Sequence, residues 1–118
     1  MKNLDLVGKY LFALPFGVFG LMHLMAGDGM SGLVPAFIPG GVLWVYLTGI
    51  SLLAACIAIL LGKQAKLAAT LLGVLMLVFV ASIHLPAVIG GDQMAMSGVL
   101  KDLALAGAAW MYAAKTDA

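Results

Sequence analysis

The chain has 118 residues, of which 64% are hydrophobic and 9% are charged, and its formal net charge is +1. A soluble domain of this length could not bury so much apolar surface, so the composition excludes an ordinary water-soluble protein. The near-neutral charge and the lack of a basic patch give no reason to expect a nucleic-acid partner. The expected surroundings are a lipid bilayer.

Four strongly apolar stretches follow one another along the chain, with short polar breaks between them. They are Tyr10–Ala26, Val42–Gly62, Leu67–Ile89 and approximately Met96–Ala114. Each is close to the roughly 20 residues that cross about 30 Å of hydrocarbon as a helix. The sequence therefore predicts an all-α fold, in which residues 1–118 form a single integral-membrane four-helix bundle.

The first stretch also has the basic flank of a secretory signal peptide. A cut after Ala26 would place Leu24 at the −3 position, where a small residue is preferred. We therefore expect the first stretch to remain as a membrane helix.

Lysine positions predict how the bundle is oriented. Basic residues lie before the first helix, between the second and third, and after the fourth: Lys2, Lys9, Lys63, Lys66 and Lys115. The other two connections carry Asp28 and Asp92 instead. Because cytoplasmic segments are enriched in lysine, both termini and the 63–66 turn are expected in the cytoplasm.

The connection between the first two helices is unusually apolar for a loop. It reads GDGMSGLVPAFIPGG over residues 27–41. We expect part of this segment to lie in the outer membrane interface and to cover the bundle like a lid.

A layer of polar residues is predicted near the outer end of the bundle. Counting from the cytoplasmic lysines at about 1.5 Å per residue puts its members roughly 20–27 Å into the membrane. They are His23, Tyr46, His84, Lys101 and Asp102. Asp102 is the expected inward member of its pair and the natural partner of an imidazole, since Lys101 can extend to water. Residues this close to the membrane boundary can equally be explained by such extension alone, although ionisable groups within membranes usually face the bundle interior.

Two metal-binding alternatives involve the histidines. His23 and His84 could ligate a b-type haem if they face each other, and outer-end methionines beside His23 would suit Cu(I). Those methionines are Met22, Met25, Met30, Met94 and Met96. Both alternatives rank below a metal-free site, so no metal and no cofactor is assigned.

Several segments, in order, resemble the DoxX-like family of small four-helix bacterial membrane proteins. The segments are GLMHLM, VPAFIPGGVLWVYLTGI, IHLP and LKDLALAGAAWMY. The resemblance covers nearly the full length. The resemblance aligns His23 with a histidine that the family carries late in the first helix, and Tyr46 and Gly49 with the Tyr and Gly that open the second helix. Lys101 and Asp102 align with the family's Lys-Asp pair in the fourth helix. His84 aligns with a position that is often polar. Leu52 stands where many members carry a glutamate, which puts any proton relay through that carboxylate in doubt.

The resemblance implies a bacterial inner-membrane protein connected with redox chemistry. The family takes its name from a subunit associated with a thiosulfate:quinone oxidoreductase, and other members are linked to redox stress and quinone handling. The leading hypothesis is that His23, Tyr46, His84, Lys101 and Asp102 line an outer-leaflet pocket for a quinone-like or other amphipathic small molecule. Enzymatic activity stays open, because the chain has no recognisable flavin, nicotinamide or iron–sulfur motif.

A second hypothesis makes the chain a structural or assembly subunit of a membrane complex. The polar layer would then hold the helices together by interhelical hydrogen bonds. A membrane oxidoreductase partner and a homo-oligomer are the alternatives left open. A transporter is less expected, since the sequence shows no pair of broken half-helices.

Overall fold

In the computed structural model, which describes residues 2–25 and 41–117, the chain forms four helical rods. They comprise α1 (Lys2–Met25), α3 (Val42–Leu61), α4 (Ala65–Phe79) continued through the π-helical turn η2 (Val80–His84) into α5 (Leu85–Ile89), and α6 (Ala95–Lys115). The all-α class and the four helices confirm the prediction. The predicted lid (residues 27–41) lies, apart from Gly41, outside the described residues.

Helix α1 begins well before the apolar stretch that predicted it. It includes Lys2, Asp5 and Lys9 ahead of Tyr10, and it passes through Pro15 without ending. Asp5 lies in the first turn, where a carboxylate interacts favourably with the positive end of the helix dipole. The hydrophobic pattern therefore predicted the apolar part of the helix but not the residue at which the helix begins.

Among the described residues, three segments are long and apolar enough to cross a membrane. They are Asn3–Met25, Val42–Leu61 and Ala65–Ile89. Large apolar side chains are exposed along them, including Leu11, Ile50 and Leu71. Exposed surface of this kind is costly in water and suits contact with lipid. The chain is therefore a multi-pass membrane protein by length and composition.

Helix α6 is long enough to be a fourth span but does not meet the same criterion of apolarity. It carries the charged pair Lys101 and Asp102, and many of its other residues are alanine or glycine. The charged residues and the glycines lower the mean hydropathy of α6, so composition alone does not place α6 across a membrane.

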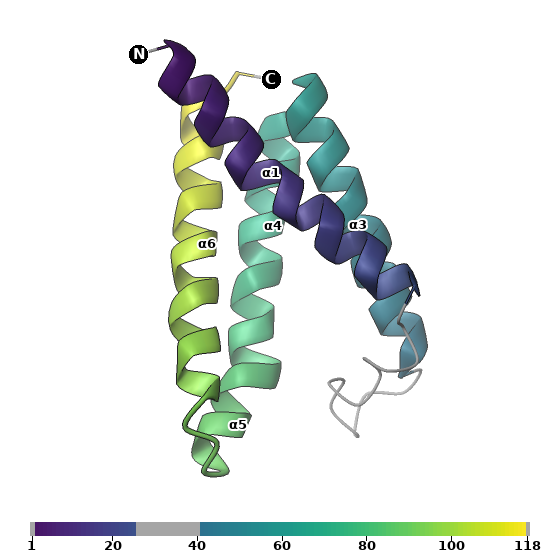
Figure 1. Ribbon diagram of the computed structural model, residues 1–118, viewed down its shortest axis with the longest axis vertical. Helices are drawn as coiled ribbons and strands as arrows, with labels where there is room; N and C mark the ends of the chain where they lie inside the picture. Colours follow the sequence, from purple (N-terminus) through teal and green to yellow (C-terminus); the bar gives the residue numbers. More distant parts are fainter. Residues whose placement is uncertain (1, 26–40, 118) are drawn as a thin grey trace.

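The four rods are arranged as two closely packed pairs. Helix α1 packs mainly on α3, and α4 packs mainly on α6, with a smaller contact between α3 and α4. Figure 1 shows α1 crossing in front of the bundle, while α4 and α6 run side by side. The start of α1, the α3–α4 turn and the end of α6 lie at the same end of the molecule.

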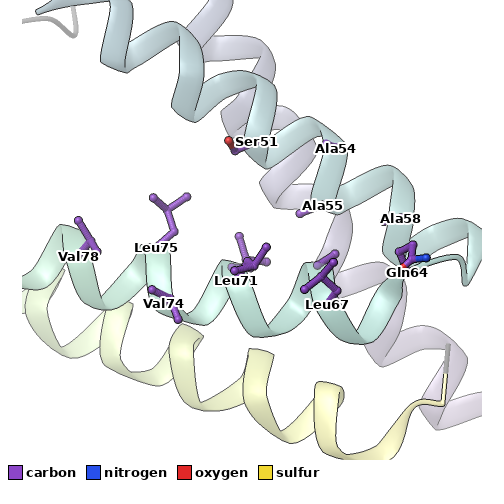
Figure 2. A pocket seen from close by; sticks show the side chains of 12 residues that line it. Ser51, Ala54, Ala55, Ala58, Gln64, Leu67, Leu71, Val74, Leu75 and Val78 are labelled. Carbon is purple, nitrogen blue, oxygen red and sulfur yellow. The ribbon is translucent and has the colours of Figure 1, made fainter. Parts of the chain in front are cut away.

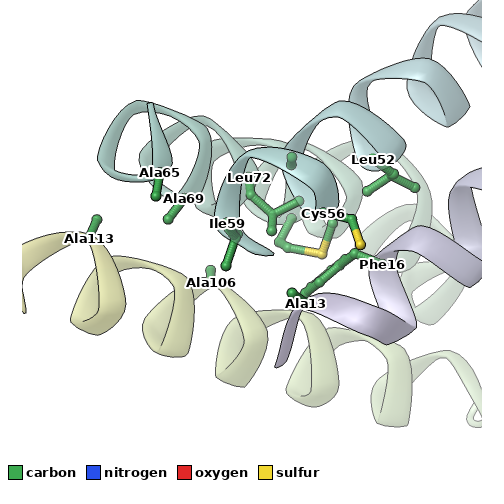
Figure 3. Close-up of a cluster of buried hydrophobic side chains, with 12 residues drawn as sticks. Ala13, Phe16, Leu52, Cys56, Ile59, Ala65, Ala69, Leu72, Ala106 and Ala113 are labelled. Atoms are coloured by element: carbon green, nitrogen blue, oxygen red, sulfur yellow. The ribbon is translucent and has the colours of Figure 1, made fainter. Parts of the chain in front are cut away.

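Small residues allow each pair to pack closely. A Cβ atom at Gly20 would lie 2.7 Å from the Gly49 carbonyl oxygen, so α1 and α3 meet backbone to backbone. In the other pair, Gly73 of α4 lies against the indole of Trp110, whose Nε1 donates a hydrogen bond of 3.1 Å to the Thr70 carbonyl. The pairs share one apolar core, in which Phe16 and Ile59 pack among alanines (Figure 3).

Candidate functional site

The clearest polar contact in the described part of the chain joins His84 to Asp102. His84 Nε2 lies 2.8 Å from Asp102 Oδ2, which joins η2 to α6. The Asp102 side chain is 7% exposed and the His84 side chain 26% exposed. Asp102 is the one buried charged residue that the structure describes, whereas its neighbour Lys101 is exposed. Both the inward position of Asp102 and its contact with an imidazole are confirmed.

The chemistry of the pair assigns different roles to the two imidazole nitrogens. An ionised carboxylate can only accept hydrogen bonds, so Nε2–H donates to Asp102. In the neutral imidazole, Nδ1 then carries a lone pair. Nδ1 makes no hydrogen bond to another described residue, and no side-chain nitrogen or oxygen among those residues is both fully buried and unpaired. Nδ1 is therefore a hydrogen-bond acceptor that is not fully buried, on a ring that is 26% exposed and lies against Gly98.

Gly98 makes room for the His84 ring on α6. A Cβ atom at this position would lie 2.8 Å from His84 Nδ1 and 2.9 Å from Cε1, closer than real contacts allow. Gly98 precedes Asp102 by four residues and so lies on the same face of α6. The sequence analysis missed Gly98, although its spacing from Asp102 was the available signal.

A π-helical turn positions His84 at the end of α4. The Leu85 backbone N–H donates to the Val80 carbonyl, five residues earlier. Pro86 accounts for the change, because it has no N–H for the Ser82 carbonyl and its ring crowds that carbonyl in a regular α-helix. Single π-helical turns are rare and occur frequently at functional sites.

His23 is tied to its own helix. Its Nδ1 donates a 2.6 Å hydrogen bond to the Phe19 carbonyl, and its Cβ lies where a side chain on Gly49 would have to go. The ring is partly buried at the α1–α3 contact. No described hydrogen bond joins His23 to His84 or Asp102.

Among the described residues, no hydrogen bond joins Lys101 or Tyr46 to the His84–Asp102 pair. Lys101 Nζ lies 5.9 Å from the centre of the Phe19 ring, a cation–π distance that brings α6 toward α1. Tyr46 is partly buried on α3. Of the five residues predicted to form the site, His84 and Asp102 are the two that a described hydrogen bond joins. A ligand-binding role stays a prediction for all five.

The described residues provide no cluster of ligands for the haem or copper site considered above. These residues include no group of three or more histidine, cysteine, aspartate or glutamate side chains placed to hold a metal ion. Met30, one of the five methionines considered for Cu(I), lies outside them.

Comparison with known proteins places the chain in a family without an assigned function. A sequence model described as "Domain of unknown function (DUF8561)" matches residues 12–106. The chain belongs to this family. The match includes His23, Tyr46, His84, Lys101 and Asp102, and it names no DoxX-like family, so that resemblance stays a prediction. No curated protein and no solved structure matches the chain.

Proposed function

We propose that this chain is a membrane protein that binds a quinone-like or other amphipathic small molecule, with the His84–Asp102 pair as its central polar contact. The observation that carries the proposal is a partly exposed imidazole whose Nε2 is held 2.8 Å from a buried carboxylate, which leaves Nδ1 without a hydrogen-bond partner among the described residues. Ligand sites commonly place a few polar groups within apolar surroundings.

The pair suits a ligand whose polar group alternates between hydroxyl and carbonyl. A quinol hydroxyl would donate to the Nδ1 lone pair of neutral His84. A quinone carbonyl would instead accept from Nδ1–H of the protonated ring, whose charge Asp102 would compensate. The proposal covers binding and leaves electron transfer to another protein, since the chain carries no recognisable redox-cofactor motif.

We retain His23, Tyr46 and Lys101 as further candidate contacts for a ligand larger than the pair itself. His23 donates through Nδ1 and so keeps an acceptor at Nε2. Lys101 approaches α1 from α6 through the Phe19 ring. The DoxX-like resemblance supports the redox connection by analogy, through motif order and spacing.

We further propose that α6 is a fourth membrane span and that both termini face the cytoplasm of a bacterial inner membrane. Helix α6 packs along α4, which together with η2 and α5 forms a segment apolar and long enough to cross. The Asp102 carboxylate accepts a hydrogen bond from His84, which reduces the cost of placing that carboxylate in hydrocarbon. Orientation rests on the lysines at one end of the bundle.

The proposal is tested by titrating purified protein in detergent with a ubiquinol or menaquinol analogue and measuring affinity. His84→Ala should weaken binding roughly threefold to tenfold, because one hydrogen bond contributes about 0.5–1.5 kcal/mol. Asp102→Asn should weaken it less, since the amide oxygen can still accept from Nε2–H.

Ser82→Ala is the matched control for this titration. Its hydroxyl lies in the same π-helical turn but donates to the Val78 carbonyl of its own helix. The variant should bind like wild type. Equal affinity in wild type, His84→Ala and Asp102→Asn would sink the proposed site.

A second function is favoured by the interhelical position of the same contact. In a structural or assembly subunit, the His84–Asp102 bond would hold η2 against α6, and membrane hydrogen bonds contribute about 0.6–2 kcal/mol. This reading expects Asp102→Asn to lower thermal stability while wild type binds no quinol. Measurable quinol affinity in wild type distinguishes the first function from the second.

A further inference from the structure

A wedge-shaped cleft lies between α3 and α4, whereas α6 packs on the other side of α4 (Figure 2). The cleft has a volume of about 490 Å³ and narrows toward the α3–α4 turn, as Figure 2 shows. Alanines line much of it, namely Ala54, Ala55, Ala58 and Ala68, while leucines and valines of α4 form the facing wall. The small alanines leave space between the two helices, and the cleft lies in a different part of the molecule from the His84–Asp102 pair.

The dimensions and the lining point to a hydrocarbon chain as the occupant. The volume falls within the roughly 300–1,000 Å³ of small-molecule sites, and it is too small for a helix of about 10–12 Å diameter from a second copy or partner. Ser51 is polar, but its hydroxyl donates to the Leu47 carbonyl of its own helix at 2.8 Å. The body of the cleft therefore offers no free polar group to a ligand.

The narrow end of the cleft is different, because it combines an amide with positive charge. Gln64 lines this end and immediately precedes α4, and Lys63 and Lys66 are exposed on either side of it in the sequence. The Lys63 backbone N–H donates to the carbonyl of Ala58, a lining residue, so the basic turn is attached directly to the cleft. The start of α4 adds its own positive dipole end.

Gln64 also has an unusual backbone conformation. Its φ of 55° lies in the left-handed region, and it is the one residue other than glycine with positive φ among those described. Glycine would adopt this conformation with less steric cost. The Gln64 amide lines an otherwise mostly apolar cleft and can both donate and accept hydrogen bonds, which suits a polar headgroup.

We propose that the α3–α4 cleft binds one anionic glycerophospholipid. An acyl chain occupies the wedge between the alanines of α3 and the leucines of α4. The phosphate lies at the turn, against Lys63, Lys66 and the Gln64 amide. Basic pockets at the ends of membrane helices recognise lipid headgroups by this chemistry.

The test measures lipid retained by the purified full-length chain, using native mass spectrometry with dioleoyl phosphatidylglycerol and dioleoyl phosphatidylcholine in competition. Wild type should retain one phosphatidylglycerol in preference to phosphatidylcholine. Lys63→Gln/Lys66→Gln should reduce that preference roughly tenfold or more, since each lysine near a membrane surface strengthens anionic-lipid binding about fivefold. Lys9→Gln/Lys115→Gln removes the same charge at the same end and should leave the preference unchanged.

A second variant tests the acyl chain separately from the headgroup. Ala58→Leu should fill the cleft and reduce retention of both lipids, whereas Ala104→Leu, at an exposed position of α6 outside the cleft, should not. Glycerol phosphate without acyl chains should fail to displace the bound lipid. Equal retention of the two lipids by wild type, an unchanged preference in Lys63→Gln/Lys66→Gln, or displacement by glycerol phosphate would each overturn the proposal.

Discussion

The fit between Gly98 and the His84 ring gives the most local prediction. Gly98→Ala would place a methyl group 2.8 Å from His84 Nδ1 and force the ring away from Asp102. Overpacking of this kind costs about 1–3 kcal/mol, so the free energy of unfolding should fall by that amount. Thermal or denaturant unfolding in detergent measures it.

Gly107→Ala is the matched control on the same helix. Beyond the backbone of α6 itself, no atom of the described residues lies within 4 Å of a Cβ at this position, and alanine is the better helix former. The control should match wild type or exceed it by up to about 1 kcal/mol. A Gly98→Ala variant as stable as Gly107→Ala would show that the His84 ring is not held as described.

For single residues, the sequence predicts which side chain is buried better than it predicts where a side chain points around its helix. The choice of Asp102 over Lys101 as the inward residue followed from the short aspartate side chain, and burial of Asp102 confirms it. Counting helical rise placed His23 and His84 at similar depth, but it gave no rotation about the helix axis. His23 bonds the backbone of α1, and nothing in its neighbouring residues indicated this.

At the scale of elements, Pro86 and the π-helical turn control how His84 is presented. Pro86→Ala restores an N–H, which can donate to the Ser82 carbonyl and convert η2 to a regular α-helix. The change in turn should rotate His84 relative to Asp102. We expect a more stable helix with weaker quinol binding.

Hydrogen exchange and titration together check the Pro86 prediction. The new amide at residue 86 should be protected, and affinity for a quinol analogue should fall toward that of His84→Ala. A protected amide with unchanged affinity would show that the π-helical turn does not serve ligand binding.

The apolar stretches predicted four helices because their lengths match the membrane. They did not predict the π-helical turn, although Pro86 was visible, because a proline in a membrane helix can be accommodated in several ways. Nor could they predict that α4 pairs with α6 while α1 pairs with α3. Pairing depends on which faces carry small residues, and glycine and alanine occur around most of these helices.

At the scale of the whole molecule, the proposed four-span topology makes a prediction about accessibility. On a Cys56→Ser background, a membrane-impermeant thiol reagent should label Asp92→Cys in intact cells. Lys63→Cys and Lys115→Cys should react only after the membrane is opened, because both lie at the end that we place in the cytoplasm. Labelling of Lys115→Cys in intact cells would contradict α6 as a fourth span.

We propose that His84 offers Nδ1 to a ligand while Asp102 holds Nε2–H. Nitrogen-15 NMR of the protein labelled at histidine tests it most directly, because the chain contains just two histidines, His23 and His84. We predict that Nε2 of His84 carries a proton, and that the Nδ1 resonance of His84 changes when a quinol analogue is added. His23 reports independently whether α1 also contacts the ligand. Saturating ligand that binds the protein and leaves both His84 nitrogen resonances unchanged would contradict the account.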